Sequence, residues 1–234
     1  MENTFKIDTE YKKCFEYRID CMLQLLNLNK VDSIIDLGCG LQTLKNKIPQ
    51  SIQYTGVDLY KHMESTIQVD FNKGEFYNEE VDIIFCSGIF EYIYDLKTFI
   101  KKIGNNTNIV IGSYHFFNNT KNRPESWVNS LTYDEFYNMW YNIGYYPIFL
   151  CNTKYFNHPF LGEQDDIFIL INNKQNNEII NYATINIIEF RKNFILYNSK
   201  LNKIDYNFNS IINTLSWWIP IKKWRDNFRN SFIK

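Results

Sequence analysis

Short apolar segments that alternate with polar or amphipathic stretches constrain the fold of this sequence more than any other feature. Each apolar segment has the length of a buried strand, and residues that favour turns separate it from the next stretch. Strands are expected at residues 33–37, 54–59, 67–71, 81–87, 109–114, 146–153 and 166–171. Because strands alternate with helices, the sequence predicts βαβ units in a mostly parallel sheet with both faces covered.

Helices are expected between most of these strands. They lie at residues 11–27, from the glycine turn at 38–40 through Lys45, at 96–103, and from Thr132 to Gly144. Thr132 and Glu135 have the spacing of a capping box, in which the two side chains satisfy free backbone N–H groups. The last two strands leave no room for a helix between them, so they are expected to pair antiparallel through residues 157–164.

The pattern predicts one doubly wound α/β domain over residues 1–172 and a helical C-terminal extension over residues 173–234. A polar run at residues 172–177 separates the two parts. Apolar residues between Ile179 and Phe194 recur at helical spacing, which predicts a helix with one buried face. That face is expected to pack against the domain or against a second subunit, as in a homodimer.

Charge, cysteine content and hydropathy exclude several classes of protein. The formal net charge of the 234 residues is −1 and the pI is about 6.3, which disfavours nucleic-acid binding through a basic surface. Five scattered cysteines without metal-binding spacing indicate reduced thiols. Neither a secretory signal nor an apolar stretch of membrane-spanning length is expected, so the protein is predicted to be cytoplasmic.

The segment Ile34-Ile35-Asp36-Leu37-Gly38-Cys39-Gly40 carries the most chemical information. A strand that runs into a glycine turn lets the backbone approach a ligand closely at the carboxyl end of a parallel sheet. Asp58 ends the next expected strand, where a carboxylate can accept hydrogen bonds from both hydroxyls of a ribose. The dinucleotide fingerprint requires a further glycine where this sequence has Thr43, which argues against a dinucleotide.

Four motifs in this order resemble those of class I S-adenosylmethionine (SAM)-dependent methyltransferases. They are IIDLGCG at 34–40, YTGVDL at 54–59, VDFN at 69–72 and VDIIFCSGIFEYIYDL at 81–96. The resemblance extends over about residues 15–172. It is strongest to the small methyltransferases encoded among bacterial capsule and lipopolysaccharide genes. It implies a seven-stranded Rossmann-like sheet, SAM as cofactor and S-adenosylhomocysteine (SAH) as product.

The resemblance also implies roles for individual residues. Asp36 would bind the methionine amino group and Asp58 the ribose, with Leu59 beside it. The remaining cofactor-binding positions it implies are the turn residues Gly38, Cys39 and Gly40, the adenine-framing residues Asp70 and Phe71, and Ser87 and Gly88 near the reacting methyl. Leu41-Gln42 follows the glycine turn where many members of the family have another glycine, so the turn is expected to be more crowded.

Methyl transfer to a hydroxyl requires alignment and is helped by a general base. His115 directly follows the fifth expected strand and is the first candidate for a base or an acceptor-orienting residue, with an ordinary loop histidine as the alternative. Tyr114 could hydrogen-bond to the acceptor. Glu91 could orient a substrate or cap the next helix. His62 and His158 are expected at the surface or in loops.

The polar stretch 116–130 is expected to be a long loop that contributes to substrate binding. It contains Asn118, Lys121, Arg123, Trp127 and Asn129. Arg and Lys suit a phosphate or carboxylate and Trp offers a flat face to a sugar, so a small, polar, anionic acceptor is expected. A solvated loop anchored by Trp127 is the alternative. No metal site is expected, because Asp165 and Asp166 alternate faces in an extended segment.

The expected acceptor is a small sugar, sugar phosphate or similar precursor of a bacterial surface glycan, methylated on oxygen or, alternatively, on nitrogen. A non-catalytic SAM-binding scaffold and an RNA or protein methyltransferase are the rival interpretations. The tail from Trp217 to Lys234 combines aromatic residues with five cations against one Asp226. This composition predicts peripheral docking on an anionic membrane or a glycan-assembly partner, or else an ordinary packed helix.

Overall fold

The computed structural model describes residues 9–117, 123–156, 165–172, 177–189 and 192. The chain divides into two compact units, residues 1–185 and 186–234. The first unit extends beyond the expected boundary at residue 172, since the backbone N–H of Asn27 donates to the Ile179 carbonyl at 2.7 Å and Leu26 forms a β-bridge with Ile180. All helices and strands given below belong to this first unit.

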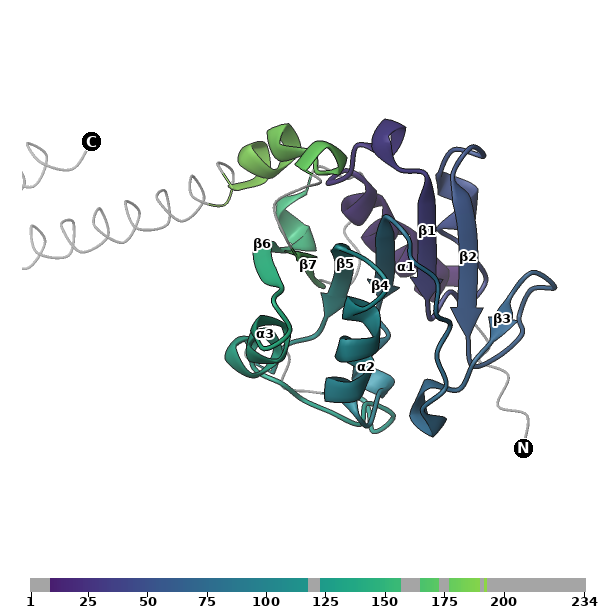
Figure 1. The fold of residues 1–234 in the computed structure, drawn as a ribbon. Coiled ribbons are helices and arrows are strands. Elements are labelled where there is room, and N and C mark those ends of the chain that lie inside the picture. Colours follow the sequence, from purple (N-terminus) through teal and green to yellow (C-terminus); the bar gives the residue numbers. More distant parts are fainter. Residues whose placement is uncertain (1–8, 118–122, 157–164, 173–176, 190–191, 193–234) are drawn as a thin grey trace, which may run out of the picture. The chain divides into compact units, whose positions relative to one another are not determined.

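A seven-stranded sheet in the order β3-β2-β1-β4-β5-β7-β6 forms the centre of the unit (Figure 1). Its strands are β1 Ser33–Leu37, β2 Gln53–Asp58, β3 Ile67–Gln68, β4 Ile83–Ser87, β5 Ile109–Tyr114, β6 Tyr146–Asn152 and β7 Asp166–Ile171. The first five strands pair in parallel, whereas β7 is antiparallel to both β5 and β6. The predicted doubly wound sheet and its antiparallel final pair are confirmed.

Three α-helices accompany the sheet: α1 Thr9–Leu23, α2 Leu96–Gly104 and α3 Tyr133–Tyr141. α2 and α3 share one hydrophobic cluster with alternate residues of the central strands, so they cover the same face, and α1 lies on the opposite face (Figure 1). Aromatic rings dominate this cluster, with Phe90 packed edge-on against Phe136 at 5.4 Å between ring centres. Because helices cover both faces of the sheet, the central strands are largely apolar along their length.

The ends of the helices follow local sequence rules. Asp95 caps α2 by accepting a hydrogen bond from the Thr98 backbone at 3.1 Å. The predicted capping box at the start of α3 is confirmed, because Thr132 and Glu135 each accept from the other's backbone N–H. α3 ends at Tyr141, and Gly144 then takes the left-handed conformation that lets the chain turn towards β6.

Two local predictions were wrong. The helix expected after the glycine turn is absent, and turns lead into a short 3-10 helix at Lys45–Lys47. Gln42 has φ +56°, which a right-handed helix cannot include, and its buried side chain donates to Thr66 Oγ1 at 3.1 Å and accepts from Ser65 at 2.9 Å. β3 is shorter than expected because Asp70 caps a 3-10 turn by accepting from the Asn72 backbone.

Candidate active site

The glycine turn and the end of β2 form one hydrogen-bonded unit at the carboxyl edge of the sheet. Gly38 and Gly40 have φ values of +75° and +49°, which glycine adopts without steric cost. The backbone N–H groups of Gly38 and Cys39 donate to the Val57 carbonyl at 2.8 and 3.2 Å. This connection fixes the turn directly beside the strand that ends at Asp58.

Asp58 stands where the sequence predicted a ribose-binding carboxylate. Its Oδ2 accepts from the Gly40 backbone at 2.8 Å and its Oδ1 from the Tyr60 backbone at 3.1 Å. A carboxylate offers roughly four lone-pair positions, so it retains capacity for two hydroxyl donors. The side chain of the adjacent Leu59 is exposed, so it is available to contact a ligand there.

Asp36 is a buried carboxylate without an ion-pair partner among the described residues. The hydroxyl of Tyr54 donates to its Oδ2 at 2.7 Å. Burial raises the pKa of Asp36 to about 7, since the Tyr54 hydrogen bond offsets only part of the desolvation and the charge of Asp58 adds to the increase. A cationic group would therefore be stabilised beside Asp36.

A cavity of about 120 Å³ adjoins this carboxylate and is called the glycine-turn cavity below. Its walls are the turn, the end of β4 and one side of α1, including Phe15, Arg18, Asp36, Gly38, Gly40 and Ser87. Five of the residues predicted to bind the cofactor, Asp36, Gly38, Cys39, Gly40 and Ser87, therefore lie around one cavity.

Asp70 and Phe71 follow β3, but their side chains are already engaged. Asp70 accepts from the Asn72 backbone at 3.1 Å and lies 3.3 Å from Lys73 Nζ. The Phe71 ring packs on Phe99 with 5.0 Å between ring centres. Their role in framing adenine stays a prediction, and these contacts favour a backbone rather than a ring contribution from Phe71.

Arg18 lies on α1 and links this helix to the end of β4. Its Nε donates to Ser87 Oγ at 2.8 Å, and its Nη1 donates to Asp165 Oδ1 at 3.1 Å. Gly88 has φ +71°, and a Cβ at this position would lie 2.9 Å from a guanidinium nitrogen of Arg18. A side chain at this position would displace the guanidinium, so Ser87 and Gly88 help to position Arg18 and also border the cavities.

A second cavity, of about 160 Å³, shares Phe15 and Arg18 with the first and is called the charged cavity below. Four buried ionisable side chains contribute to its walls: Arg18, Glu91, His115 and Asp165. They come from α1, from the 3-10 helix Phe90–Tyr92, from the residue after β5 and from the residue before β7. The fold thus collects them from four separate parts of the chain.

His115 lies between the two carboxylates of this cavity. Its Nδ1 is 3.2 Å from Glu91 Oε1 and its Nε2 is 2.9 Å from Asp165 Oδ1. Burial alone would lower the pKa of His115, but the adjacent carboxylates of Asp165 and Glu91 outweigh burial and raise it to about 9. The ring is therefore an imidazolium at neutral pH, with no lone pair to accept a proton, which favours the orienting role over the base.

Asp165 anchors both cations of the cavity. Burial alone would raise the pKa of Asp165, but the charge of Arg18 and the hydrogen bond of His115 bring it below its usual range. The sequence did not single out Arg18, and Asp165 was predicted only not to form a metal site. A buried arginine on the apolar face of an amphipathic helix was the one available signal.

Glu91 does not cap the following helix, because Asp95 does so. Its Oε1 accepts from the His115 backbone N–H at 2.9 Å. Its Oε2 is buried and has no hydrogen-bond partner among the described residues. Glu91 therefore lines the charged cavity and has one buried acceptor oxygen that no described group uses.

Tyr114 lies in the core rather than at the mouth of the site. Its hydroxyl donates to Asn129 Oδ1 at 2.5 Å and accepts from the Leu131 backbone at 2.9 Å, and its ring stacks on Phe136. The Asn129 amide also donates to the Phe90 carbonyl at 2.7 Å. This hydrogen bonding favours a structural role for Tyr114 and Asn129 over contact with the acceptor.

Arg123 is likewise engaged within the protein. Its guanidinium donates to the His115 carbonyl and, at 3.0 Å, to the Asn129 carbonyl, and it lies 4.7 Å above the Trp127 ring. Trp127, in contrast, lines the charged cavity, and its ring centre is 4.7 Å from that of His115. Of the three predicted substrate-binding residues, Trp127 is thus the one placed at a cavity.

One of the remaining residues singled out in the sequence is described, and the others are not. His62 is exposed and contacts Tyr60. Asn118, Lys121, His158 and the tail from Trp217 to Lys234 lie outside the described residues. Within the described part of the chain, no cluster of three or more His, Cys, Asp or Glu side chains is suited to hold a metal ion.

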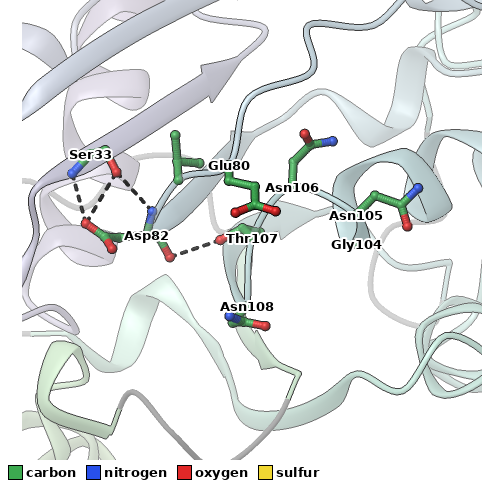
Figure 2. Close-up of a pocket in the computed structure, with 9 residues that line it drawn as sticks. Ser33, Glu80, Asp82, Gly104, Asn105, Asn106, Thr107 and Asn108 are labelled. Carbon is green, nitrogen blue, oxygen red and sulfur yellow. Dashed lines mark hydrogen bonds between the residues drawn. The ribbon is translucent and has the colours of Figure 1, made fainter.

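A larger polar groove of about 380 Å³ lies at the opposite, amino-terminal edge of the sheet (Figure 2). Asp82 accepts there from the backbones of Asp32 and Ser33 at 2.7 and 3.0 Å, and its carbonyl accepts from Thr107 at 2.9 Å. These bonds join the starts of β1, β4 and β5. We attribute the groove's polar lining to this structural network.

Comparison with solved structures identifies the fold. An S-adenosylmethionine-dependent methyltransferase from Clostridium acetobutylicum is 13% identical with a TM-score of 0.52, covering 73% of this chain and 95% of its own. The magnesium protoporphyrin IX methyltransferase of Synechocystis, solved with bound SAH, is 11% identical with a TM-score of 0.52, covering 72% of this chain and 89% of its own. This chain has the fold of class I SAM-dependent methyltransferases.

A third similar structure was solved with bound 1,6-didemethyltoxoflavin and SAH. The 1,6-didemethyltoxoflavin-N1-methyltransferase of Burkholderia thailandensis is 11% identical with a TM-score of 0.52, covering 70% of this chain and 81% of its own. No protein-family model and no curated protein matches the sequence. At these identities the structural similarity establishes the fold, and the activity has to be argued from the site.

Proposed function

We propose that this protein transfers a methyl group from SAM to a small acceptor. The observation that carries the proposal is Asp36, a buried carboxylate with no ion-pair partner among the described residues, in the wall of the glycine-turn cavity. The ammonium group of SAM would supply the missing cation. The pyrophosphate of a dinucleotide would instead bring negative charge to this carboxylate, which costs free energy.

The residues around the cavity fit the parts of SAM. Asp36 would hold the amino group, the turn Gly38-Cys39-Gly40 would pass close to the methionine portion, and Asp58 would accept from the ribose hydroxyls. When bound, SAM supplies an electrophilic methyl group on a sulfonium. Ser87 and Gly88 would lie beside this methyl because they border the two cavities, with the acceptor in the charged cavity.

For the acceptor, we propose a small sugar or sugar-phosphate precursor of a bacterial surface glycan, methylated on oxygen. The resemblance of four sequence motifs to methyltransferases of capsule and lipopolysaccharide gene clusters supports this class, as does the aromatic wall that Trp127 gives the charged cavity. His115, as an imidazolium, would orient the acceptor through Glu91. Methylation on nitrogen remains the alternative chemistry for the same cavity.

A non-catalytic SAM-binding scaffold is the rival from another class. The two differ in product, since a scaffold would bind SAM without ever releasing SAH. An RNA or protein methyltransferase is less favoured, because a formal net charge of −1 offers little attraction to a polyanion.

We also propose that the basic, aromatic tail from Trp217 to Lys234 determines where in the cell the protein is located. None of the described helices is long and apolar enough to cross a membrane. The tail composition suits reversible binding to an anionic surface, with each cation near such a surface contributing about 1 kcal/mol. Cytoplasmic location with peripheral membrane docking is consistent with this composition.

Calorimetry with SAM, SAH and NADH tests the proposed function. We expect SAM and SAH to bind at a single site and NADH to bind weakly or not at all. Incubation with SAM and a panel of sugars and sugar phosphates should then release SAH with at least one of them. Tight binding of NADH without binding of SAM would overturn the proposal.

A further inference from the structure

We propose that the charged cavity binds a neutral six-membered ring through a hydroxyl group that donates a hydrogen bond to Glu91 Oε2. Glu91 would then take up the hydroxyl proton during methylation. This inference rests on the proposed methyltransferase function and names the acceptor group that the same site would take.

The first observation is the hydrogen bonding of Glu91. Its Oε1 is occupied by the backbone and ring of His115, whereas its buried Oε2 has no partner among the described residues. A buried carboxylate oxygen without a donor is costly, on the order of 1–3 kcal/mol or more. An acceptor hydroxyl that donates to Oε2 would remove this cost.

The second observation is the balance of charge in the cavity. Among the lining residues, Arg18 and His115 lie against the carboxylates of Glu91 and Asp165. Both cations are paired with these carboxylates at 3.2 Å or less. An anionic acceptor would have to displace one of these pairs, whereas a neutral hydroxyl leaves all four in place. This favours a neutral reacting group over the anion that the loop sequence predicted.

The third observation is the size and shape of the space. The cavity has a volume of about 160 Å³, and Phe15, Tyr92 and Trp127 contribute to its walls. A designed apolar cavity of about 150 Å³ holds one benzene molecule, so a single six-membered ring fits. The Trp127 indole is held by a hydrogen bond from its Nε1 to the Tyr92 hydroxyl at 3.2 Å. The ring would therefore meet a fixed aromatic wall.

The proton has a defined destination in this arrangement. As the acceptor oxygen bonds to the methyl carbon, the carbon–sulfur bond breaks with its electron pair remaining on sulfur, and the hydroxyl proton passes to Glu91 Oε2. Glu91 becomes a neutral carboxylic acid and later releases the proton to water. His115 keeps its own proton throughout and acts as a positioning residue that holds Oε1.

Binding of simple ring compounds tests this inference without the true acceptor. We would measure phenol, anisole, cyclohexanol and benzoate by saturation-transfer NMR on the full chain with SAH present. Phenol should bind at least tenfold more tightly than anisole, its methyl ether, because anisole has no hydroxyl to donate. Phenol should also bind more tightly than benzoate. The affinity for cyclohexanol tests whether a saturated ring is accepted as well as an aromatic one. Equal binding of phenol and anisole, or tighter binding of benzoate, would overturn the inference.

The variant Glu91→Gln should lose the preference for phenol over anisole. Glu80→Gln is the matched control, since Glu80 is exposed in the groove at the opposite edge of the sheet, and it should bind both compounds as the wild type does (Figure 2). An unchanged preference in Glu91→Gln refutes the inference. If that variant does not fold, the comparison of phenol with anisole on the wild type still decides. Failure to bind SAM or SAH would instead refute the proposed function, so the two failures can be told apart.

Discussion

The buried Asp36 carboxylate should make the proposed binding of SAM dependent on pH, in a direction that follows from its raised pKa. Binding of an ammonium group requires the ionised carboxylate, and the pKa of Asp36 in the free protein is about 7. Such a group is about half ionised at pH 7 and about one-tenth ionised at pH 6, so SAM affinity should fall roughly fivefold between these values. The amino group of the ligand stays protonated over this range.

Calorimetry on the wild type and Asp36→Asn at pH 6.0, 6.5 and 7.0 measures this dependence. The variant should bind SAM about ten- to a hundredfold more weakly at pH 7, the loss of a charge-assisted hydrogen bond. Its affinity should also be flat with pH. Adenosine, which has no amino acid portion, is the matched ligand and should bind the wild type equally at all three values. A flat profile in the wild type, or the same slope in the variant, would refute the assigned role of Asp36.

The same shift predicts an effect on stability. Because the pKa of Asp36 is higher in the folded chain than its ordinary value of 3.8, the folded state retains a proton that the unfolded state loses between about pH 4 and 7. The free energy of unfolding contributed by this group therefore falls as pH rises through that window. Asp36→Asn should raise the melting temperature of the ligand-free protein at pH 8, at about 2–4 °C per kcal/mol.

Three other predictions concern single residues, and a fourth concerns the tail. Asp58→Ala should weaken SAM binding about ten- to a hundredfold by calorimetry, and an unchanged affinity would remove Asp58 from the site. The raised pKa of His115 stabilises the fold below about pH 6.5, and this stability is lost as pH rises through 9; urea titrations should show the decline in the wild type and a flatter profile in His115→Gln. Tyr114→Phe should cost about 0.5–1.5 kcal/mol of unfolding free energy and leave SAM affinity unchanged, whereas a large loss of affinity would return Tyr114 to the site. The full-length protein should sediment with anionic but not neutral liposomes at low salt, and no sedimentation with either would reject membrane docking.

The sheet could be predicted from the sequence because its strands carry their own signals. Ile109 to Tyr114, for example, is buried along its whole length, and such runs are visible without knowledge of the neighbours. The missing helix after Gly40 could not be predicted in this way. The positive φ of Gln42 accompanies side-chain hydrogen bonds to Ser65 and Thr66, which belong to a segment more than twenty residues away.

Only part of the candidate site could be predicted from the sequence. Asp36 and Asp58 occupy strand ends next to a glycine turn, so their positions follow from local sequence. The charged cavity depends on contacts between distant segments, such as the ion pair between Arg18 and Asp165. No spacing rule connects such residues, and the imidazolium state of His115 follows only from the two carboxylates that surround it.

The ion pair between Arg18 and Asp165 also has a consequence for the order in which the protein can assemble. These residues are 147 positions apart, whereas Asp36 and Asp58 lie in neighbouring strands near the start of the chain. Contacts between distant segments carry a larger entropic cost of loop closure and tend to form late in folding. During synthesis from the N-terminus, the glycine turn and β2 can meet long before β7 emerges. We therefore expect the glycine-turn part of the candidate site to form first and the charged cavity to be completed last.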